Sequence, residues 1–288
     1  MVELSTFMFS SHPKLQLNKP RLMAIVNATP DSFSDGGLLY KNNRVDRDVT
    51  LLRLEKLVHE GADIIDVGGE STRPGANSVS LQEEMDRVLP VVEWALGETD
   101  LAVSVDTSSS QLMLAVASQG AHMINDVRAL SRSGAVEAMA KTGLSVCLMH
   151  MQGTPESMQT SPSYGTVVDD VTQHLQQRID VCVAAGVNIE KICVDPGFGF
   201  GKTLQHNLTL LAHLEKFKSL GCPVLVGLSR KSMIDHLLNR EVGDRLYASL
   251  ALGLMSLERG ATILRVHDIR ATRDIIDSFI AVIDCVGG

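Results

Sequence analysis

The sequence predicts one α/β domain folded as a (β/α)8 barrel, with its functional site at the C-terminal ends of the strands. Three observations predict it. Eight short apolar runs recur along the 288 residues, longer amphipathic stretches separate them, and no linker-like change of composition divides the chain. Such alternation is typical of βα units around a parallel sheet, and the length suits one large domain. We therefore assign 1–288 to a single domain, in which 1–20 is an N-terminal extension without an assigned role.

The eight expected strands are almost continuously apolar, as strands covered on both faces of a parallel sheet should be. They are expected at 22–27, 63–67, 101–105, 122–125, 144–149, 191–194, 223–228 and 262–266.

Eight helices are expected after these strands, because apolar residues recur there with the 3.6-residue period of an amphipathic helix. They are expected at 46–61, 81–96, 108–119, 134–141, 167–185, 204–220, 245–259 and 270–283. A doubly wound sheet would show the same alternation. Its first turn should, however, carry a G-x-G-x-x-G phosphate fingerprint, which is not found here, so the count of eight favours the barrel.

Composition narrows the possible functions. The chain has 26 Lys and Arg against 34 Asp and Glu, a formal charge of −8, which argues against binding along a nucleic acid. No run of 18 apolar residues and no signal-peptide pattern occurs, so we expect a cytoplasmic protein that does not bind membranes. The five cysteines are widely spaced without C-x-x-C, and we expect them to be buried apolar residues.

Polar side chains stand at the ends of the expected strands, where barrels of this kind build their active sites. Asp106, Asn125 and Asp195 follow the third, fourth and sixth strands. They suit a ring that carries several N–H donors beside a carbonyl, such as an aminopyrimidinone, with Lys231 available to the carbonyl or to a ring nitrogen. The alternative for Asp106 alone is a helix cap. Carboxylates on apolar strands are costly unless they bind something, which favours a ligand site for the set.

A second group of strand-end residues supplies hydrogen-bond donors suited to an anion, most naturally a phosphate. Its members are Asn27, Ser71, Thr72, Arg73, Arg265 and His267. The loops at 27–37 and 68–76 are rich in Gly, Ser and Pro, and we expect them to act as lids, with Phe33 and Arg73 at their tips. The alternative is an ordinary solvated loop.

The segment 195–203 (DPGFGFGKT) ends like a phosphate-binding P-loop, but position 196 is proline where the motif requires its first glycine. We interpret its glycines as backbone that passes close to a ligand, with Phe198 or Phe200 as an aromatic wall. Met149 and His150 are either ligand contacts or packing residues, and for His150 a structural role is favoured. No H-E-x-x-H occurs, so catalytic zinc is not indicated.

Six motifs follow one another between about residues 22 and 273. They are 27–37 (NATPDSFSDGG), 71–76 (STRPGA), 104–107 (SVDT), 195–202 (DPGFGFGK), 229–232 (SRKS) and 265–268 (RVHD). Together they resemble the dihydropteroate synthases, the pterin-binding family of folate biosynthesis. The resemblance implies a TIM barrel and a transferase that condenses 6-hydroxymethyl-7,8-dihydropterin diphosphate with 4-aminobenzoate, giving 7,8-dihydropteroate and diphosphate with Mg²⁺ present.

The resemblance also implies which residues bind each substrate. The pterin would be held by Asp106, Asn125, Asp195, Lys231 and Arg265. The diphosphate would be held by Asn27, Thr72, Arg265 and His267, and Asn27 would also hold Mg²⁺. The 4-aminobenzoate would contact Thr72, Arg73, Pro74, Phe200, Ser229 and Lys231. Phe33 and Asp35 would lie on the closing first loop.

The resemblance further implies ionisation to a pterin-methyl cation, a homodimer, and competition by sulfonamides for the 4-aminobenzoate pocket. The two carboxylates near the ring would stabilise the cation, and the donors and Mg²⁺ would stabilise the departing anion. Three alternatives remain at this point: a pterin-binding methyltransferase barrel, a non-catalytic pterin-binding protein, and an ordinary phosphate-binding barrel enzyme. The first would not need the diphosphate-binding donors or the 229–231 segment, and the third would leave Asp106, Asn125 and Asp195 unexplained.

Overall fold

The computed structural model describes residues 9, 17–29, 39–41, 44–71, 79–155 and 157–286. Eight parallel strands form its central sheet, in the order β8-β7-β6-β5-β4-β1-β10-β9. A parallel bridge between Val194 and Val224 joins the two outer strands of this order and brings the sheet round into a barrel. The strands are β1 Arg21–Asn27, β4 Ile64–Gly68, β5 Ala102–Asp106, β6 Met123–Asp126, β7 Ser145–Met149, β8 Ile192–Asp195, β9 Leu225–Val226 and β10 Ile263–Val266.

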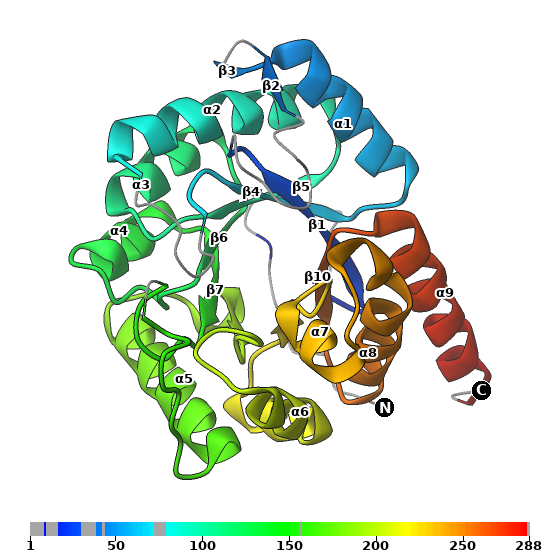
Figure 1. Ribbon diagram of the computed structural model, residues 1–288. Helices are drawn as coiled ribbons and strands as arrows, with labels where there is room; N and C mark the ends of the chain where they lie inside the picture. The colour runs from blue at the N-terminus through cyan, green and yellow to red at the C-terminus, as the bar shows by residue number, and fades with distance from the viewer. Residues whose placement is uncertain are drawn as a thin grey trace.

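The helices surround the strands in chain order, as Figure 1 shows from α1 round to α9. They are α1 Arg47–His59, α2 Leu81–Glu98, α3 Ser110–Gln119, α4 Ala135–Thr142, α5 Val167–Ala184, α6 Leu204–Ala212, α7 Ser232–Leu238, α8 Leu246–Glu258 and α9 Ile269–Val286. A short hairpin of β2 Tyr40–Lys41 and β3 Arg44–Val45 precedes α1. The expected (β/α)8 barrel and all eight expected strands are confirmed.

Two helical features differ from the sequence prediction. The single helix expected at 204–220 is α6 followed by a 3₁₀ helix, Leu214–Leu220. Its buried residues Leu214, Phe217 and Leu220 are spaced by three, which is the period of a 3₁₀ helix. The structure also contains α7, which has only seven residues and is too short to show an apolar period in sequence.

The inside of the barrel holds one apolar side chain from near the start of each strand. These side chains are Met23, Ile64, Ala102, Met123, Cys147, Cys193, Leu225 and Ile263. Phe9 and Leu17 pack against this layer, so these two residues help to close the N-terminal end of the barrel. The expectation for cysteine is right for four of the five and wrong for Cys285, which is exposed on α9.

None of the helices in the described ranges is both long enough and apolar enough to cross a bilayer.

Candidate active site

A cavity of about 780 Å³ lies at the C-terminal ends of the strands. Its volume is within the usual range for small-molecule sites, ~300–1,000 Å³. Every predicted substrate-binding residue that the structure describes lines this cavity. These residues are Asn27, Asp106, Asn125, Asp195, Phe200, Ser229, Lys231, Arg265 and His267. Phe33, Asp35, Thr72, Arg73 and Pro74 lie outside the described residues.

Strand register explains why side chains far apart in sequence meet here. Asn27 of β1 pairs with Gly68 of β4, Gly68 pairs with Asp106 of β5, and Asp106 pairs with Asn125 of β6. These four positions therefore form one row around the barrel mouth. Gly68 contributes no side chain, which leaves room between Asn27 and Asp106.

An ion-pair network with Arg265 at its centre connects this row to β10. The guanidinium donates from Nε to Asp66 Oδ2 at 2.6 Å and from Nη2 to Asp106 Oδ2 at 3.0 Å. One cation thus holds two carboxylates from neighbouring strands. Because these bonds use Nε and one Nη, the planar group is fixed in orientation with respect to the cavity.

Asp66 was not assigned to the site by the sequence prediction. It is fully buried on β4 and accepts from Ser104 Oγ at 2.6 Å and from Asn125 Nδ2 at 2.9 Å, as well as from Arg265. It therefore orients the amide of Asn125, with its nitrogen toward Asp66 and its oxygen left for other partners. The signal in the sequence was a carboxylate within an apolar strand, a placement that requires compensating partners.

Burial raises the pKa of Asp106 to about 7, although the charge of Arg265 opposes the rise. This carboxyl group therefore exchanges its proton near neutral pH, as groups at functional sites often do. It is not the helix cap considered as an alternative, because Ser109 caps α3 and its Oγ accepts the N–H of Leu112.

Asp195 and Lys231 form the opposite side of the mouth. Asp195 Oδ1 accepts the N–H of Gly197 at 2.7 Å, and burial raises the pKa of this carboxyl, an effect that the charge of Lys231 opposes. Burial lowers the pKa of Lys231 to about 8, and the charge of Asp195 opposes this shift. Lys231 Nζ donates to the carbonyl of Phe198 and lies 4.5 Å from the centroid of the Phe200 ring.

The glycine-rich segment after β8 makes its closest approach to the protein's own backbone. Gly197 has a φ of +71°, and a Cβ at this position would lie 1.8 Å from the carbonyl oxygen of His150. A Cβ at Gly201 would lie 2.6 Å from the carbonyl oxygen of Gln152. The expectation of close approach is right for these two glycines, but the neighbour is the chain after β7 instead of a ligand. Gly199 does line the cavity.

Lys202 supports the rejection of a P-loop. It is only 3% exposed, and its Nζ donates to the carbonyls of Gly197 at 2.9 Å and Phe200 at 3.0 Å. It also hydrogen-bonds His150 Nδ1 at 2.9 Å. Burial and the nearby Lys202 lower the pKa of His150 to about 2, which agrees with the favoured structural role of that histidine. The ammonium group therefore braces the loop from inside.

The aromatic wall predicted for this segment is Phe200. Phe198 is fully buried in the hydrophobic core, whereas Phe200 lines the cavity. Met149, at the end of β7, also lines it.

The turns after β9 and β10 hold each other through Ser229 and His267. Ser229 Oγ accepts the backbone N–H of His267 at 3.2 Å and lies 3.1 Å from its Nδ1. Arg230 and Asp268, one residue further along each turn, form an ion pair.

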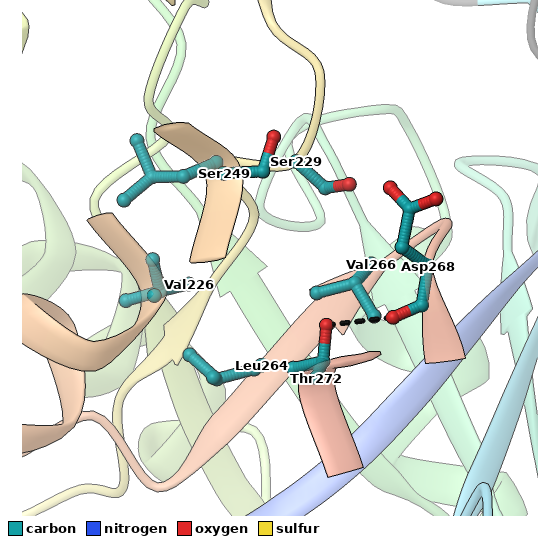
Figure 2. A pocket seen from close by; sticks show the side chains of 9 residues that line it. Val226, Ser229, Ser249, Leu264, Val266, Asp268 and Thr272 are labelled. Atoms are coloured by element: carbon teal, nitrogen blue, oxygen red, sulfur yellow. Dashed lines mark hydrogen bonds between the residues drawn. The ribbon is translucent and has the colours of Figure 1, made fainter. Parts of the chain in front are cut away.

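A second, much smaller pocket of about 10 Å³ lies behind these turns, between β9, β10, α8 and α9 (Figure 2). Its walls include Val226, Leu264 and Thr272. This volume holds at most about one water molecule, so the pocket is a packing defect beside the site and has no room for a substrate.

The barrel, with the acceptors Asp106, Asn125 and Asp195 and the cations Lys231 and Arg265 interleaved around its mouth, has the architecture of a (β/α)8 enzyme with a small-molecule site at its C-terminal face. Residues 23–267 match the family described as pterin binding enzyme. The chain is 47% identical over 269 residues to the dihydropteroate synthase of Haemophilus influenzae, covering 93% of this chain and 96% of the relative.

Solved structures agree. Yersinia pestis dihydropteroate synthase with a sulfonamide drug complex has a TM-score of 0.91 and 46% identity, over 96% of this chain and 100% of that chain. Xanthomonas albilineans dihydropteroate synthase in complex with 7,8-dihydropteroate has a TM-score of 0.82 and 42% identity, over 93% and 95%. The chain belongs to the pterin-binding enzymes and, within them, to the dihydropteroate synthase family. The predicted family, enzyme class and role in folate biosynthesis are confirmed.

Proposed function

We propose that this enzyme condenses 6-hydroxymethyl-7,8-dihydropterin diphosphate with 4-aminobenzoate, giving 7,8-dihydropteroate and diphosphate. The observation that carries the proposal is the arrangement of one cavity. Acceptors from β5, β6 and β8 line it together with Lys231, Arg265 and His267. The product of this reaction is the molecule bound by the similar X. albilineans enzyme.

The pterin ring is assigned to the hydrogen-bond acceptors at the ends of β5, β6 and β8. Its N–H donors match the carboxylates of Asp106 and Asp195 and the amide oxygen of Asn125, and its carbonyl or ring nitrogen matches the ammonium of Lys231. Arg265 lies beside the ring through its bond to Asp106. Two largely buried carboxylates need hydrogen-bond donors in place of the water they have lost, which favours a ring with N–H groups over an apolar one.

The chemistry assigned to the site is ionisation at the pterin methylene. The carbon–oxygen bond to the diphosphate breaks, both electrons leave with the oxygen, and the amine of 4-aminobenzoate then attacks the pterin-methyl cation and loses a proton. Asp106 and Asp195, in their ionised forms, stabilise the positive ring by their negative charge. The side chains of Arg265 and His267 stabilise the leaving anion.

Mg²⁺ belongs with the diphosphate in this proposal. The described part of the chain contains no group of three His, Cys, Asp or Glu side chains that could enclose a metal ion. Asn27 at the end of β1 offers one hard amide oxygen at the cavity. That donor set fits Mg²⁺, which is commonly held by one or two protein oxygens together with substrate phosphates and water. Bound there, the ion would neutralise charge on the leaving group.

The 4-aminobenzoate is assigned to Phe200, Ser229 and Lys231, together with Thr72, Arg73 and Pro74 of the second loop. Phe200 supplies a ring face, and Lys231 lies over it, which places a cation beside the aromatic substrate. Phe33 and Asp35 would close the first loop over the site. Sulfonamides share the shape of 4-aminobenzoate, and we expect them to compete for this subsite.

We also propose that the enzyme is a homodimer of the cytoplasm. On α8, Tyr247 is 83% exposed and Met255 is also exposed, and Leu238 is exposed at the end of α7. Exposed large apolar side chains are frequent at subunit interfaces. Sedimentation of the wild type and of Tyr247→Lys tests this: a dimeric mass for the first and a shift toward the monomer for the second are expected.

The reaction is tested by mass-spectrometric detection of 7,8-dihydropteroate. Purified protein is mixed with the pterin diphosphate, 4-aminobenzoate and Mg²⁺, and each component is left out in turn. Product that requires the protein and both substrates supports the synthase, and its dependence on Mg²⁺ tests the metal assignment. Binding of the pterin diphosphate without any product would favour a non-catalytic pterin-binding protein, and binding of methyltetrahydrofolate instead would favour the methyltransferase alternative.

A further inference from the structure

The turn after β9 holds a residue in an unusual backbone conformation between two cavity residues. Arg230 has a φ of +57°, in the left-handed region that residues with a Cβ rarely adopt. Ser229 precedes it and Lys231 follows it, and both line the cavity. A strained backbone of this kind persists only where its surroundings hold it in place.

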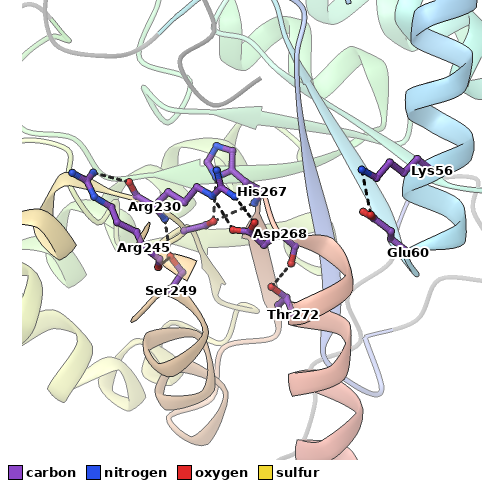
Figure 3. A network of polar contacts seen from close by, with 9 residues as sticks. Lys56, Glu60, Arg230, Arg245, Ser249, His267, Asp268 and Thr272 are labelled. Carbon is purple, nitrogen blue, oxygen red and sulfur yellow. Dashed lines mark hydrogen bonds and ion pairs between the residues drawn. The ribbon is translucent and has the colours of Figure 1, made fainter. Parts of the chain in front are cut away.

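The start of α8 holds the two peptide groups of this residue. Ser249 Oγ accepts the N–H of Arg230 at 3.0 Å, and Arg245 Nη1 donates to the carbonyl of Arg230 at 3.1 Å (Figure 3). The hydroxyl of Ser249 donates to the carbonyl of Arg245 at 2.7 Å, which leaves an oxygen lone pair directed at the turn. Both contacts come from the start of α8, and together they satisfy the N–H and the carbonyl of Arg230.

The side chain of Arg230 is held as well. Its guanidinium makes a two-point ion pair with Asp268, in which Nε lies 2.9 Å from Oδ2. Thr272 Oγ1 donates to the carbonyl of Asp268 at 2.7 Å, a bond that Figure 2 also shows. Backbone and side chain of Arg230 are therefore fixed from two different helices, α8 and α9.

We propose that Ser249 and Arg245 are positioning residues, which keep Arg230 left-handed and so direct Ser229 and Lys231 toward the substrates. The inference rests on the proposed function and extends it to Ser249 of α8, which does not line the cavity, and to Arg245, which does. If Arg230 relaxed to a negative φ, the peptide groups on its two sides would rotate. The side chains of Ser229 and Lys231 would then no longer face the cavity together.

The test uses Ser249→Ala with a matched control from the same helix. Ser256 is buried, and its Oγ donates to the carbonyl of Leu252 at 2.7 Å, the same backbone bond that Ser249 makes to Arg245. Ser256 does not line the cavity. We expect Ser249→Ala to lower kcat/KM for 4-aminobenzoate about 10-fold, as loss of one hydrogen bond allows, while Ser256→Ala changes it less than about 2-fold.

A double-mutant cycle with Arg230→Gly separates positioning from simple support of the helix. Glycine adopts a positive φ without a steric penalty, so it needs no clamp. The effect of Ser249→Ala should therefore shrink from about 10-fold to less than about 3-fold when residue 230 is glycine. Ser249→Thr, which keeps a hydroxyl, should retain most of the wild-type activity.

The outcomes are distinct. If the wild type makes no dihydropteroate, the proposed function fails. If the wild type is active but Ser249→Ala acts equally in both backgrounds, or resembles Ser256→Ala, the positioning role is overturned and the function stands. Where Arg230→Gly is too unstable to assay, Arg230→Asn replaces it, because asparagine also tolerates the left-handed region.

Discussion

Each end of the barrel contains an aspartate paired with arginine, partly buried at the N-terminal end and fully buried at the C-terminal end, and the two ends use the pair differently. At the N-terminal end, Asp63 accepts from Arg21 and Arg273, each at 3.1 Å, and from the backbone N–H of Leu22 at 2.8 Å. At the C-terminal end, Asp66 holds Arg265, which reaches on to Asp106 in the cavity. The first set of bonds joins strand to helix, and the second directs polar groups at a ligand.

This difference teaches that burial and ion pairing alone do not identify a site. Next to Asp63 lies the apolar layer that Phe9 and Leu17 help to close. Next to Asp66 lies the open cavity. In such barrels, residues at the C-terminal face generally serve the chemistry, and residues at the N-terminal face generally serve stability. Asp63 directly precedes β4 and Asp66 lies within it, so the two aspartates show this division along one stretch of chain.

The largest effect is expected for Asp66→Ala. The change leaves three donors without their partner, on Ser104, Asn125 and Arg265, and breaking a buried charge pair costs about 3–5 kcal/mol of unfolding free energy. Denaturant unfolding measures this loss. Turnover of the folded fraction should also fall, because Arg265 and Asn125 lose their orientation. Asp66→Asn keeps the shape and serves as the milder variant if the alanine protein does not fold.

Asp195→Asn should be next in size and should act on binding. Asparagine has one acceptor oxygen where aspartate has two, and it carries no negative charge to pair with the ring or with Lys231. We expect about 100-fold weaker binding of the pterin diphosphate, measured by calorimetry, because hydrogen bonds to charged groups contribute roughly 1.5–3 kcal/mol each. Thermal stability should change little. Unchanged affinity would remove Asp195 from the assigned site.

The sequence predicted the strands, and it predicted which polar residues meet at the mouth of the barrel, for one physical reason. Parallel strands end at the same face of the barrel, so a polar residue that follows an apolar run lies at the mouth. Asp106, Asn125 and Asp195 could therefore be placed there without knowing which side chains surround them. Asp66 shows the limit of that reasoning. Its role depends on which side chains the register of β4, β5 and β6 brings around it, and a linear sequence does not contain that register.

The missed helical details have a similar cause. The division of 204–220 at His213 and the seven residues of α7 depend on packing against neighbouring elements, since short segments have no stable conformation by themselves. The same holds for Arg230. Glycine and asparagine are the residues whose presence in a sequence suggests a positive φ, and the left-handed Arg230 depends instead on contacts with the start of α8, 15 and 19 residues later.

Asp63→Ala should give a smaller loss, confined to stability. The side chain of Asp63 is 15% exposed, so water can partly solvate the arginines left behind, and we expect a cost of about 2 kcal/mol. Denaturant unfolding gives the cost, and kcat/KM should stay within about 2-fold of the wild type. A large kinetic defect at normal stability would contradict the division between the two ends.

The smallest effect is expected from pH, and it applies to the C-terminal end alone. Because Asp106 has its pKa raised to about 7, its ionised fraction rises from about 10% at pH 6 to about 90% at pH 8. Affinity for 6-hydroxymethyl-7,8-dihydropterin, which carries no titrating diphosphate, should therefore increase up to about 10-fold over this range. Ring N–H donors bind the carboxylate better than the acid.

The same raised pKa has the opposite effect on stability, because its contribution to the free energy of unfolding falls as the pH rises. The ordinary pKa of aspartate is 3.8, so between about pH 4 and pH 7 the folded protein retains a proton that the unfolded chain has released. The stabilisation is complete below that range and is lost as the pH rises through 7. Asp106→Asn should remove the contribution of this carboxyl to both slopes, that of pterin affinity and that of unfolding free energy, while the contributions of other shifted groups such as Lys231, whose pKa is lowered to about 8, remain. Asp63→Asn should leave both in place, and if it flattened the affinity profile, the titration would have to be assigned to a group other than Asp106.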